Sequence, residues 1–275
     1  MANKIGTVGI IGLGRMGRCM VKGLLETQTL KKSDLLFTTK HLETAAQIEQ
    51  ELEIKACKTN SELIEKSDII VIAVKPQNIS EVLDEVGKKI SKGQTIVSIV
   101  ASISTSLIES KLPKGVAVIR AMPNTPAFVG AGMIAWCNGS KALEKDWERA
   151  QTLFQPLGKV ARVDEKHMDA VTGLSGCGPA YLYVVLESLT DAGIKVGLPR
   201  ELATQLAGQT VLGAARMLLD TGRHPAALKD EVTTPAGCTI DGLLELEEGK
   251  LRVTLIKAVV QATKRAKTLA KQVKL

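Results

Sequence analysis

The chain has 275 residues, 45% of them apolar, which is long enough for one large domain or for two smaller domains with separate cores. Its five cysteines are odd in number and have no C-x-x-C spacing, which argues against a zinc site and against a secreted disulfide framework, so we expect no metal. The net charge of +7 indicates affinity for an anion: a nucleic acid, a phosphorylated cofactor or a carboxylate substrate.

The first apolar run of the chain covers only residues 8–11 and leads directly into a glycine turn. It is too short for the core of a signal peptide, and no uninterrupted apolar run of about 20 residues follows that would form a transmembrane helix. Together with the odd cysteine count, this predicts a protein of the reducing cytoplasm without a membrane partner.

A predicted strand over residues 7–11, a glycine-rich turn and a helix through residue 25 open the chain. The turn reads G-x-G-x-x-G, in which the first glycine permits a tight turn, the second lets the backbone approach a pyrophosphate and the third allows close packing of helix on strand. We expect the whole turn to contact a dinucleotide; the alternative is a structural glycine turn. Its residues are Gly12, Leu13, Gly14, Arg15, Met16 and Gly17.

The second predicted strand, residues 35–38, is followed by a threonine and a lysine. A fold that prefers NAD commonly has an acidic residue here for the ribose hydroxyls, and this sequence has none at that point. Hydroxyls and an amine suit the additional 2′-phosphate, so the sequence favours NADPH, with Thr38, Thr39 and Lys40 as contacts. Glu43 lies near enough in sequence to compensate for the missing carboxylate, which leaves NADH as the second choice.

Helices and strands continue to alternate: a helix at 43–51, a strand at 69–74, a helix at 79–90 and a strand at 94–99. This alternation predicts an α/β fold with a doubly wound parallel sheet, which we expect to form a first domain, residues 1–164. Ligands of such sheets lie outside the carboxyl ends of the strands. Asn60, in a predicted turn before a helix, and the segments 73–76 and 100–102, which follow strands, are therefore expected at the ligand edge.

Two prolines stiffen the segment 120–126, which follows a further predicted strand. They leave the side chains of Asn124 and Thr125 available to bond a ligand or the backbone. The residues themselves support a ligand contact and a rigid turn held by its own asparagine equally well.

From about residue 165 the strand-like alternation ends and long helical stretches follow, interrupted at 197–199, at 224–225 and at Gly249. Apolar residues around 202–218 fall near one side of a helix, which indicates packing on other helices, so we expect an all-helical second domain, residues 165–275. Several glycines between 173 and 178 indicate close packing. No G-x-S-x-G elbow frames Ser175, so it is not expected to be a hydrolase nucleophile.

A run of small residues between a proline and an apolar stretch predicts that the segment 229–243 contains an exposed helix entrance. Backbone N–H groups in a first helical turn have no partner within the helix, and with the helix dipole behind them they bind anions such as a carboxylate. Thr239 adds a hydroxyl at this point. The alternative is an ordinary capped helix start, because threonine and glycine are common there.

The densest basic stretch, residues 257–274, spreads its charges along a predicted terminal helix without aromatic residues between them. Such a helix offers little on which single-stranded bases could stack, so we expect a solvated helix face and no nucleic-acid partner. A phosphorylated cofactor and a carboxylate substrate then remain as the anions to which the net charge points.

Five segments, in order, resemble the motifs of pyrroline-5-carboxylate reductases, and together they span almost the full length of the chain. They are the GxGxxG turn, AVKP at 73–76, MPNTP at 122–126, GLSGCGPAY at 173–181 and KDEVTTPAGCT at 229–239. Two residues depart from the family pattern: Cys177 stands where serine is usual, and Ala236 replaces one glycine of a PGG triplet. A positive φ at position 236 would strain the alanine.

The resemblance implies an NAD(P)H-dependent oxidoreductase that reduces the cyclic imine 1-pyrroline-5-carboxylate to L-proline in proline biosynthesis. It implies a Rossmann-type domain followed by an all-helical dimerisation domain that exchanges helices with a second subunit, hence a homodimer or a larger homo-oligomer of dimers. It also carries over further cofactor contacts, with Asn124 near the nicotinamide. These are Asn60, Ala73, Val74, Lys75, Pro76, Ala101 and Asn124.

For the substrate, the resemblance points to the KDEVTTPAGCT segment. We expect Thr239 to be the catalytic residue, hydrogen-bonded to the imine nitrogen. The N–H groups of Gly237, Cys238 and Thr239 are expected to bind the carboxylate, with Glu231 as a further substrate contact. Cys177 and Cys238 are each either a small buried hydrophobe, which is the commoner case, or a reactive thiol.

Two other functions are consistent with a dinucleotide fold followed by helices. The β-hydroxyacid and 6-phosphogluconate dehydrogenases have a catalytic lysine about four residues after a glycine-rich helix start, and Leu182 stands four residues after Gly178 here, so an alcohol oxidation would lack its base. A sensor that binds NADPH without turnover would show no loss of NADPH absorbance when pyrroline carboxylate is added.

Overall fold

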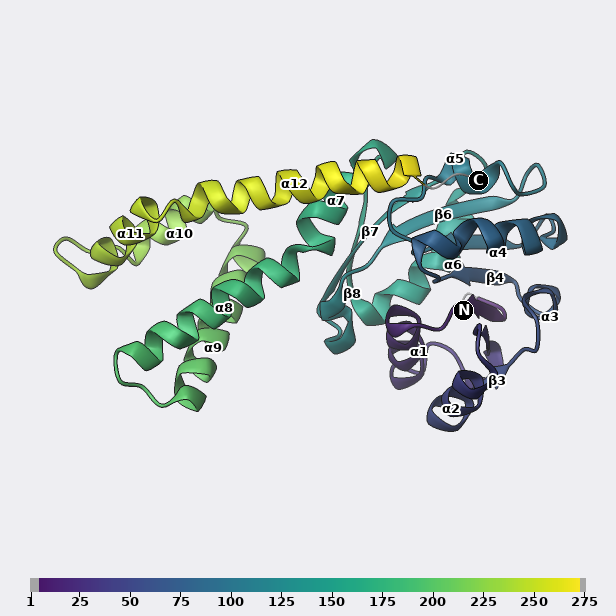
Figure 1. Ribbon diagram of the computed structural model, residues 1–275, viewed down its shortest axis with the longest axis horizontal. Helices are drawn as coiled ribbons and strands as arrows, with labels where there is room; N and C mark the ends of the chain where they lie inside the picture. The colour runs from purple at the N-terminus through teal and green to yellow at the C-terminus, as the bar shows by residue number, and fades with distance from the viewer. Residues whose placement is uncertain (1–4, 273–275) are drawn as a thin grey trace. The chain divides into compact units, whose positions relative to one another are not determined.

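One eight-stranded sheet organises the amino-terminal part of the chain (Figure 1). In spatial order its strands are β3-β2-β1-β4-β5-β6-β7-β8, and neighbouring strands are parallel except for β6 and β7. This confirms the doubly wound α/β fold and adds an antiparallel strand that the sequence does not predict. The strands are β1 (Val8–Ile11), β2 (Leu35–Thr38), β3 (Lys55–Ala56), β4 (Ile69–Ile72), β5 (Thr95–Ser98), β6 (Ala117–Met122), β7 (Gly132–Asn138) and β8 (Gly158–Arg162).

The structure is a computed structural model that describes residues 5–272. Its chain divides into unit 1, Met1–Gly176 with Gln261–Leu275, and unit 2, Cys177–Val260. The last strand ends at Arg162, just before the predicted domain boundary between residues 164 and 165, and that boundary stays a prediction.

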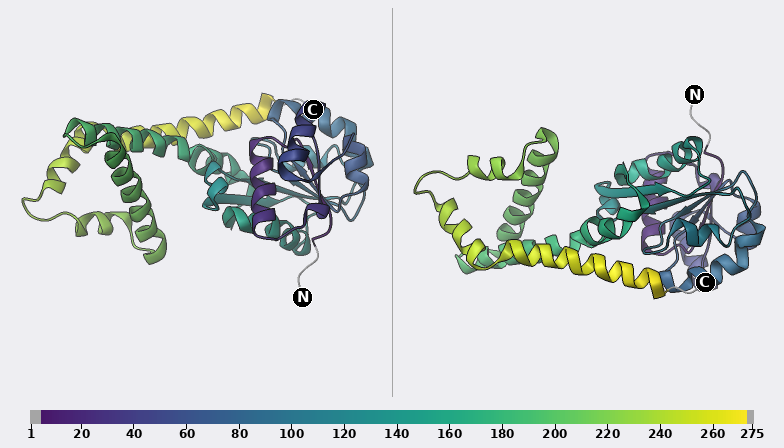
Figure 2. Two further views of the ribbon diagram at one scale, coloured as in Figure 1. Left: turned by 90° about the horizontal axis from the view of Figure 1, so that it is seen from below. Right: turned by 90° about the horizontal axis from the view of Figure 1, so that it is seen from above.

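Helices cover both faces of the sheet in unit 1 (Figure 2). Side chains of α1, α2 and α6 belong to the hydrophobic cluster on one face, and side chains of α3, α4 and α5 belong to the cluster on the other. A parallel sheet needs this double cover because both of its faces are apolar. The helices of unit 1 are α1 (Arg15–Glu26), α2 (Leu42–Leu52), α3 (Asn60–Glu65), α4 (Ile79–Val86), α5 (Thr105–Glu109), α6 (Glu144–Phe154) and α7 (Met168–Val171).

Successive residues of the central strands enter opposite clusters, as the period of a strand requires. In β1, Ile10 belongs to the cluster under α1 and Ile11 to the cluster under α4. In β4, Val71 and Ile72 divide in the same way. All four side chains are buried, which explains why these strands read as continuous apolar runs.

Several predicted boundaries differ from the structure; the strand predicted for 69–74, for example, ends at Ile72. The helix predicted for 79–90 ends at Val86, and a short 3-10 turn follows that begins at Gly87, a poor helix former. Asn60 is the first residue of α3 rather than part of a preceding turn. Thr59 is the N-cap of this helix and accepts a hydrogen bond from the N–H of Glu62 through its hydroxyl.

Unit 2 consists of helices and their connections. The predicted interruptions at 197–199, 224–225 and Gly249 lie at or between helix ends, which confirms them. The helices are α8 (Gly178–Lys195), α9 (Arg200–Thr221), α10 (Pro225–Glu231), α11 (Cys238–Glu248) and α12 (Leu251–Gln272), of which α12 continues into unit 1.

Small side chains join α8 to α9. A Cβ at Gly193 would lie 2.8 Å from the Cβ of Ala203, so the two helices approach closely at this point. Ala203 and Ala207 are buried, whereas Leu206 and Met217 of the predicted packing side remain about half exposed. Ala207 belongs to the predicted packing side and is buried, whereas the larger side chains of that side are not covered within a single chain.

A tight turn precedes α11. The N–H of Gly237 donates to the carbonyl of Thr234 over 3.0 Å, and the two residues between are Pro235 and Ala236. Proline followed by a residue of positive φ is the sequence of a type II turn. Ala236 has φ +54°, so the alanine that replaces a family glycine stands in a left-handed conformation.

Replacing Ala236 with glycine should therefore stabilise the protein. The left-handed region costs a non-glycine residue about 1 kcal/mol, which corresponds to a rise of roughly 2–4 °C in Tm for a chain of this size. Thermal unfolding at fixed protein concentration measures this effect. Gly237→Ala is the matched control and should lower Tm, because its Cβ would collide with the hydroxyl of Thr234. An unchanged or lower Tm in Ala236→Gly would contradict the strain.

Candidate functional site

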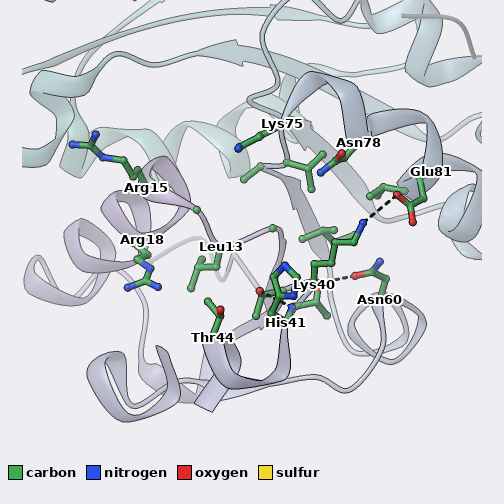
Figure 3. A pocket seen from close by; sticks show the side chains of 18 of the residues that line it. Leu13, Arg15, Arg18, Lys40, His41, Thr44, Asn60, Lys75, Asn78 and Glu81 are labelled. Carbon is green, nitrogen blue, oxygen red and sulfur yellow. Dashed lines mark hydrogen bonds and ion pairs between the residues drawn. The ribbon is translucent and has the colours of Figure 1, made fainter. Parts of the chain in front are cut away.

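A cleft of about 770 Å³ lies in unit 1 at the carboxyl ends of β1, β2 and β4 (Figure 3). The chain leaves β1 in one direction across the sheet, to β2, and returns to β4 on the other side, so the cleft lies where the strand order reverses. Ligands of open α/β sheets bind at this point. The cleft is lined by Ile11, Gly12, Leu13, Gly14, Arg15, Arg18, Thr38, Thr39, Lys40, His41, Thr44, Asn60, Ala73, Val74, Lys75, Asn78, Glu81, Val82 and Glu85.

The three glycines of the GxGxxG turn have three different surroundings. Gly12 has φ +86°, and a Cβ there would lie 2.6 Å from the side chain of Val74. At Gly14 no described atom lies within 4 Å of where a Cβ would be, so backbone on the cleft side is open to approach. At Gly17 a Cβ would lie 3.6 Å from Ile10 of β1, which is the close helix-to-strand packing that the motif predicts.

The N-terminus of α1 opens at this turn. Gly14 is the N-cap and has no side chain with which to satisfy the first N–H groups of the helix. Unsatisfied N–H groups and the helix dipole favour a negative charge. The cleft therefore contains a backbone site suited to a phosphate.

Most residues predicted as cofactor contacts come together in this cleft. Eleven of the sixteen line it. Five predicted contacts are not among the residues that line it: Met16, Gly17, Pro76, Ala101 and Asn124. The remaining lining residues are not predicted from the sequence; they are Ile11, Arg18, His41, Thr44, Asn78, Glu81, Val82 and Glu85.

The missed residues of α4 have a signal in the sequence. Asn78, Glu81 and Glu85 recur at intervals of three and four residues, the spacing of one helix face. Asn78, the N-cap of α4, lies two residues after the AVKP segment that follows β4, so this face begins at the ligand edge. Asn60 and Glu85 are 25 positions apart in the sequence, so the spacing of residues does not predict their contact.

Two ion pairs involve the cations at the cleft. Lys40, after β2, reaches Glu81 of α4 with its Nζ 3.9 Å from the carboxylate (Figure 3). Arg18 is bound to Glu51 of α2 over 2.8 Å, and Lys22 binds the same carboxylate over 2.7 Å. The hydrogen bond from Lys22 and the charge of Arg18 lower the pKa of Glu51.

A chain of hydrogen bonds crosses the cleft. The Thr38 hydroxyl lies 2.6 Å from the Asn60 Oδ1, and the Asn60 Nδ2 lies 2.7 Å from a Glu85 carboxylate oxygen. Thr38 is buried at 5% exposure, while Glu85 is exposed. The three residues belong to β2, α3 and α4, so the chain connects three separate elements.

Asn124 has protein partners on both sides of its amide. Its Oδ1 accepts from the N–H of Met133 in β7 over 2.9 Å, and its Nδ2 donates to the carbonyl of Ser175 over 3.0 Å. Ser175 lies in a π-helical turn, Thr172–Gly176, a conformation frequent at functional sites. Asn124 thus holds this turn against the sheet, and its contact with a nicotinamide stays a prediction.

The predicted substrate segment lies in unit 2. Gly237 is the N-cap of α11 and lacks a capping side chain, and Cys238 and Thr239 occupy the exposed first turn. Within a single chain Cys238 is exposed and Cys177 is partly buried. The N–H of Gly237, expected to bind a carboxylate, already donates to Thr234.

Glu231, the further predicted substrate contact, ends α10 and forms an ion pair with Arg223. The hydrogen bond from Arg223 lowers the pKa of this carboxyl. Its role toward a substrate stays a prediction.

Within residues 5–272, none of the helices is both long enough and apolar enough to cross a lipid bilayer. In the same described part of the chain, no three His, Cys, Asp or Glu side chains are grouped so that they could hold a metal ion.

Known proteins resemble the whole chain. The family model described as pyrroline-5-carboxylate reductase dimerisation matches residues 165–269, and one described as NADP oxidoreductase, coenzyme F420-dependent, matches residues 7–102. A protein of Arabidopsis thaliana named pyrroline-5-carboxylate reductase is 40% identical over 263 residues, which cover 96% of this chain and 95% of that protein.

Solved structures agree with this result. The crystal structure of Plasmodium falciparum pyrroline carboxylate reductase with NADP bound has a TM-score of 0.88 at 32% identity, and the match covers 98% of this chain and 99% of that one. A pyrroline-5-carboxylate reductase from Coxiella burnetii has a TM-score of 0.88 at 33% identity, covering 96% and 98% of the two chains. The chain therefore belongs to the pyrroline-5-carboxylate reductase family.

Proposed function

We propose that the chain carries out the reaction of its family and binds its two ligands at the N-termini of two helices. The N-terminus of α1 in unit 1 binds the cofactor, and that of α11 in unit 2 binds the substrate. The activity is that of an oxidoreductase, the reduction of 1-pyrroline-5-carboxylate to L-proline with NAD(P)H in proline biosynthesis. The observation that carries the proposal is the glycine N-cap of both helices, Gly14 and Gly237, within family motifs.

The cleft of unit 1 fits a dinucleotide. Its volume of about 770 Å³ lies within the range of small-molecule and cofactor sites. Missing side chains at Gly12 and Gly14 permit a close approach of backbone to a pyrophosphate, and Lys75 supplies positive charge to the same cleft. Bound NAD(P)H supplies the hydride of the reaction, and the chain supplies binding and orientation.

For the adenine end, the proposed contacts with a 2′-phosphate are Lys40 and Thr39. The Thr39 hydroxyl accepts weakly from the N–H of His41 over 3.5 Å, so that contact does not use its proton. Lys40 is exposed and reaches the cleft rim. These groups support the use of NADPH.

The α11 entrance suits the substrate carboxylate. We assign the carboxylate to the N–H groups of Cys238 and Thr239 and leave out Gly237, whose N–H is bonded within the turn. The Thr239 hydroxyl is assigned to the ring nitrogen.

The chemistry asks the chain mainly to place its substrate. A protonated cyclic imine is already a good electrophile, and proximity to a hydride donor converts the step into an effectively intramolecular one. A hydroxyl that holds the nitrogen fixes which carbon is presented. Such a site works without a histidine or carboxylate at the reacting atoms.

A homodimer or a larger homo-oligomer of dimers is the proposed assembly. It is supported by the match of residues 165–269 to a dimerisation family and by the exposed apolar side chains of α8, α9, α11 and α12. The cytoplasm is the proposed compartment, because all five cysteines are free, as in reducing surroundings. We propose no nucleic-acid partner.

Thr239→Val keeps the shape of the side chain and removes the hydroxyl that holds the substrate nitrogen. We expect kcat to fall by roughly 10²-fold, the cost of misplacing the reacting atoms by about 1 Å. The Kd for NADPH, measured by nicotinamide fluorescence, should not change. Thr239→Ser keeps the hydroxyl and should retain most of the activity. Full activity in Thr239→Val would remove this role.

Alkylation of cysteines reports on the α11 entrance. Cys238 is exposed and should react first with iodoacetamide, and L-proline bound at the entrance should slow its labelling. Burial, with a further contribution from the charge of Glu165, raises the pKa of Cys137 to about 12, so Cys137 should stay unlabelled at pH 8 until the protein unfolds. Peptide mass spectrometry follows both sites. Labelling of Cys238 at the same rate with and without saturating proline would argue against the substrate site.

Sedimentation tests the assembly. The native particle should have at least twice the chain mass of 29.3 kDa. Leu219 of α9 is 73% exposed in the single chain, and Leu219→Asp should weaken association by tenfold or more, since a buried leucine contributes about 1.5–3 kcal/mol. Leu143→Asp, at a 59% exposed position of unit 1, is the control and should leave the mass unchanged. A wild-type monomer would refute the assembly.

A further inference from the structure

The hydrogen-bond chain from Thr38 through Asn60 to Glu85 has a direction that its chemistry fixes. A carboxylate accepts hydrogen bonds and donates none, so the group of Asn60 that faces Glu85 at 2.7 Å is the amide N–H₂. The amide oxygen must then face Thr38, at 2.6 Å. An amide oxygen only accepts, so Thr38 donates its single hydroxyl proton to Asn60.

This direction decides what Thr38 offers to the cleft. With its proton committed to Asn60, the hydroxyl oxygen of Thr38 presents lone pairs to a ligand. A ribose hydroxyl can donate to such an oxygen. A phosphate dianion cannot, because it also carries only acceptors. Thr38 is thereby suited to a ribose hydroxyl and unsuited to the 2′-phosphate that its sequence position suggests.

An acidic side chain of α4 also lies near Lys40, the residue that favours a 2′-phosphate. Glu81 lies one helical turn before Glu85, and its carboxylate lies 3.9 Å from the Nζ of Lys40 (Figure 3). Both glutamates line the cleft. The end of β2 lacks a carboxylate in the sequence, but α4 provides two from the other side of the cleft.

We propose that Glu85 is a specificity-determining residue: through Asn60 it orients the hydroxyl of Thr38 as an acceptor for the adenine-side ribose, so that the chain binds NADH as well as NADPH. The inference rests on the proposed function of the cleft as the dinucleotide site. An NAD-preferring fold places a carboxylate directly on the ribose hydroxyls. Here Glu85 is a positioning residue that has the same effect through two neutral side chains.

Glu85→Gln tests the direction of these hydrogen bonds with almost no change in the size of the side chain. A glutamine can turn its amide and donate to Asn60, which lets the chain reverse and leaves the Thr38 proton free to point into the cleft. The Kd for NADH should rise about 3–10-fold, as expected for the loss of one hydrogen bond. The Kd for NADPH should fall or stay constant, so the ratio of the two moves toward NADPH.

Equilibrium binding, not turnover, is the readout. Nicotinamide fluorescence gives the Kd values for NADH and NADPH, and calorimetry gives those for AMP and adenosine 2′-monophosphate, which carry only the adenine-side ribose. AMP should lose affinity in Glu85→Gln, and adenosine 2′-monophosphate should keep or gain affinity. A shift seen with the dinucleotides alone, and absent with both fragments, would contradict a contact at this ribose.

Asp84→Asn is the matched control for charge. Asp84 is the neighbouring carboxylate on α4, bound to Lys111 over 2.8 Å, and is not among the residues that line the cleft. It should leave the NADH to NADPH ratio unchanged. If it moves the ratio as much as Glu85→Gln, a general charge effect replaces the proposal.

Thr38→Val tests whether the hydroxyl oxygen of Thr38 is the acceptor for the ribose. It removes the acceptor, so NADH should bind more weakly, and adding Glu85→Gln should then have no further effect on NADH, as in a double-mutant cycle. Additive losses in the double variant would overturn the proposal. If the wild-type protein binds neither dinucleotide, the function proposed for the cleft fails as well; if it binds both and Glu85→Gln changes nothing, only the role of Glu85 fails.

Discussion

The close approach of Gly12 to Val74 is the constraint on which the cleft depends. A side chain at Gly12 would collide with Val74, and its φ of +86° is one that glycine adopts without strain. Because the backbone can turn here, the chain leaves β1 directly over the end of β4 and starts α1 beside it. The helix entrance, the end of β2 and the start of α4 then share one cleft. A larger residue at this crossing would separate the groups that the cofactor must contact together.

Helix entrances in this protein differ in how their first N–H groups are satisfied. Thr59 and Ser104 cap α3 and α5 with their own hydroxyls, over 3.1 Å in each case. Gly14 and Gly237 leave α1 and α11 without such a cap. A capping hydroxyl would compete with a ligand for the same N–H groups. Because α2, α4, α8 and α9 also lack a side-chain cap, the proposed phosphate and carboxylate sites at the two glycines depend on the family motifs as well as on the missing caps.

The sequence predicts what local geometry determines and misses what packing determines. The glycine turn, β2 and the entrance of α11 depend on neighbouring residues, and they are where the sequence places them. The contact of Glu85 with Asn60 depends on how α4 packs beside α3, which a residue pattern does not encode. The sequence assigns the N–H of Gly237 to a ligand because it does not predict the turn in which this group is bonded. The sequence likewise does not predict which group of a hydrogen-bond network donates and which accepts, because this depends on the partners.

The composition of unit 2 ties the substrate site to association. Within Cys177–Val260, all of which the structure describes, the buried residues are Thr190, Ala203 and Ala207. Two alanines and a threonine supply little hydrophobic stabilisation, whereas each exposed leucine of α9 would contribute about 1.5–3 kcal/mol on burial. The α11 entrance belongs to this unit, so its order depends on the same apolar surface being covered. In the proposed homodimer, assembly would therefore stabilise the backbone groups that we propose for the substrate carboxylate. Loss of association would then weaken substrate binding before it affected the cleft of unit 1, which has its own core.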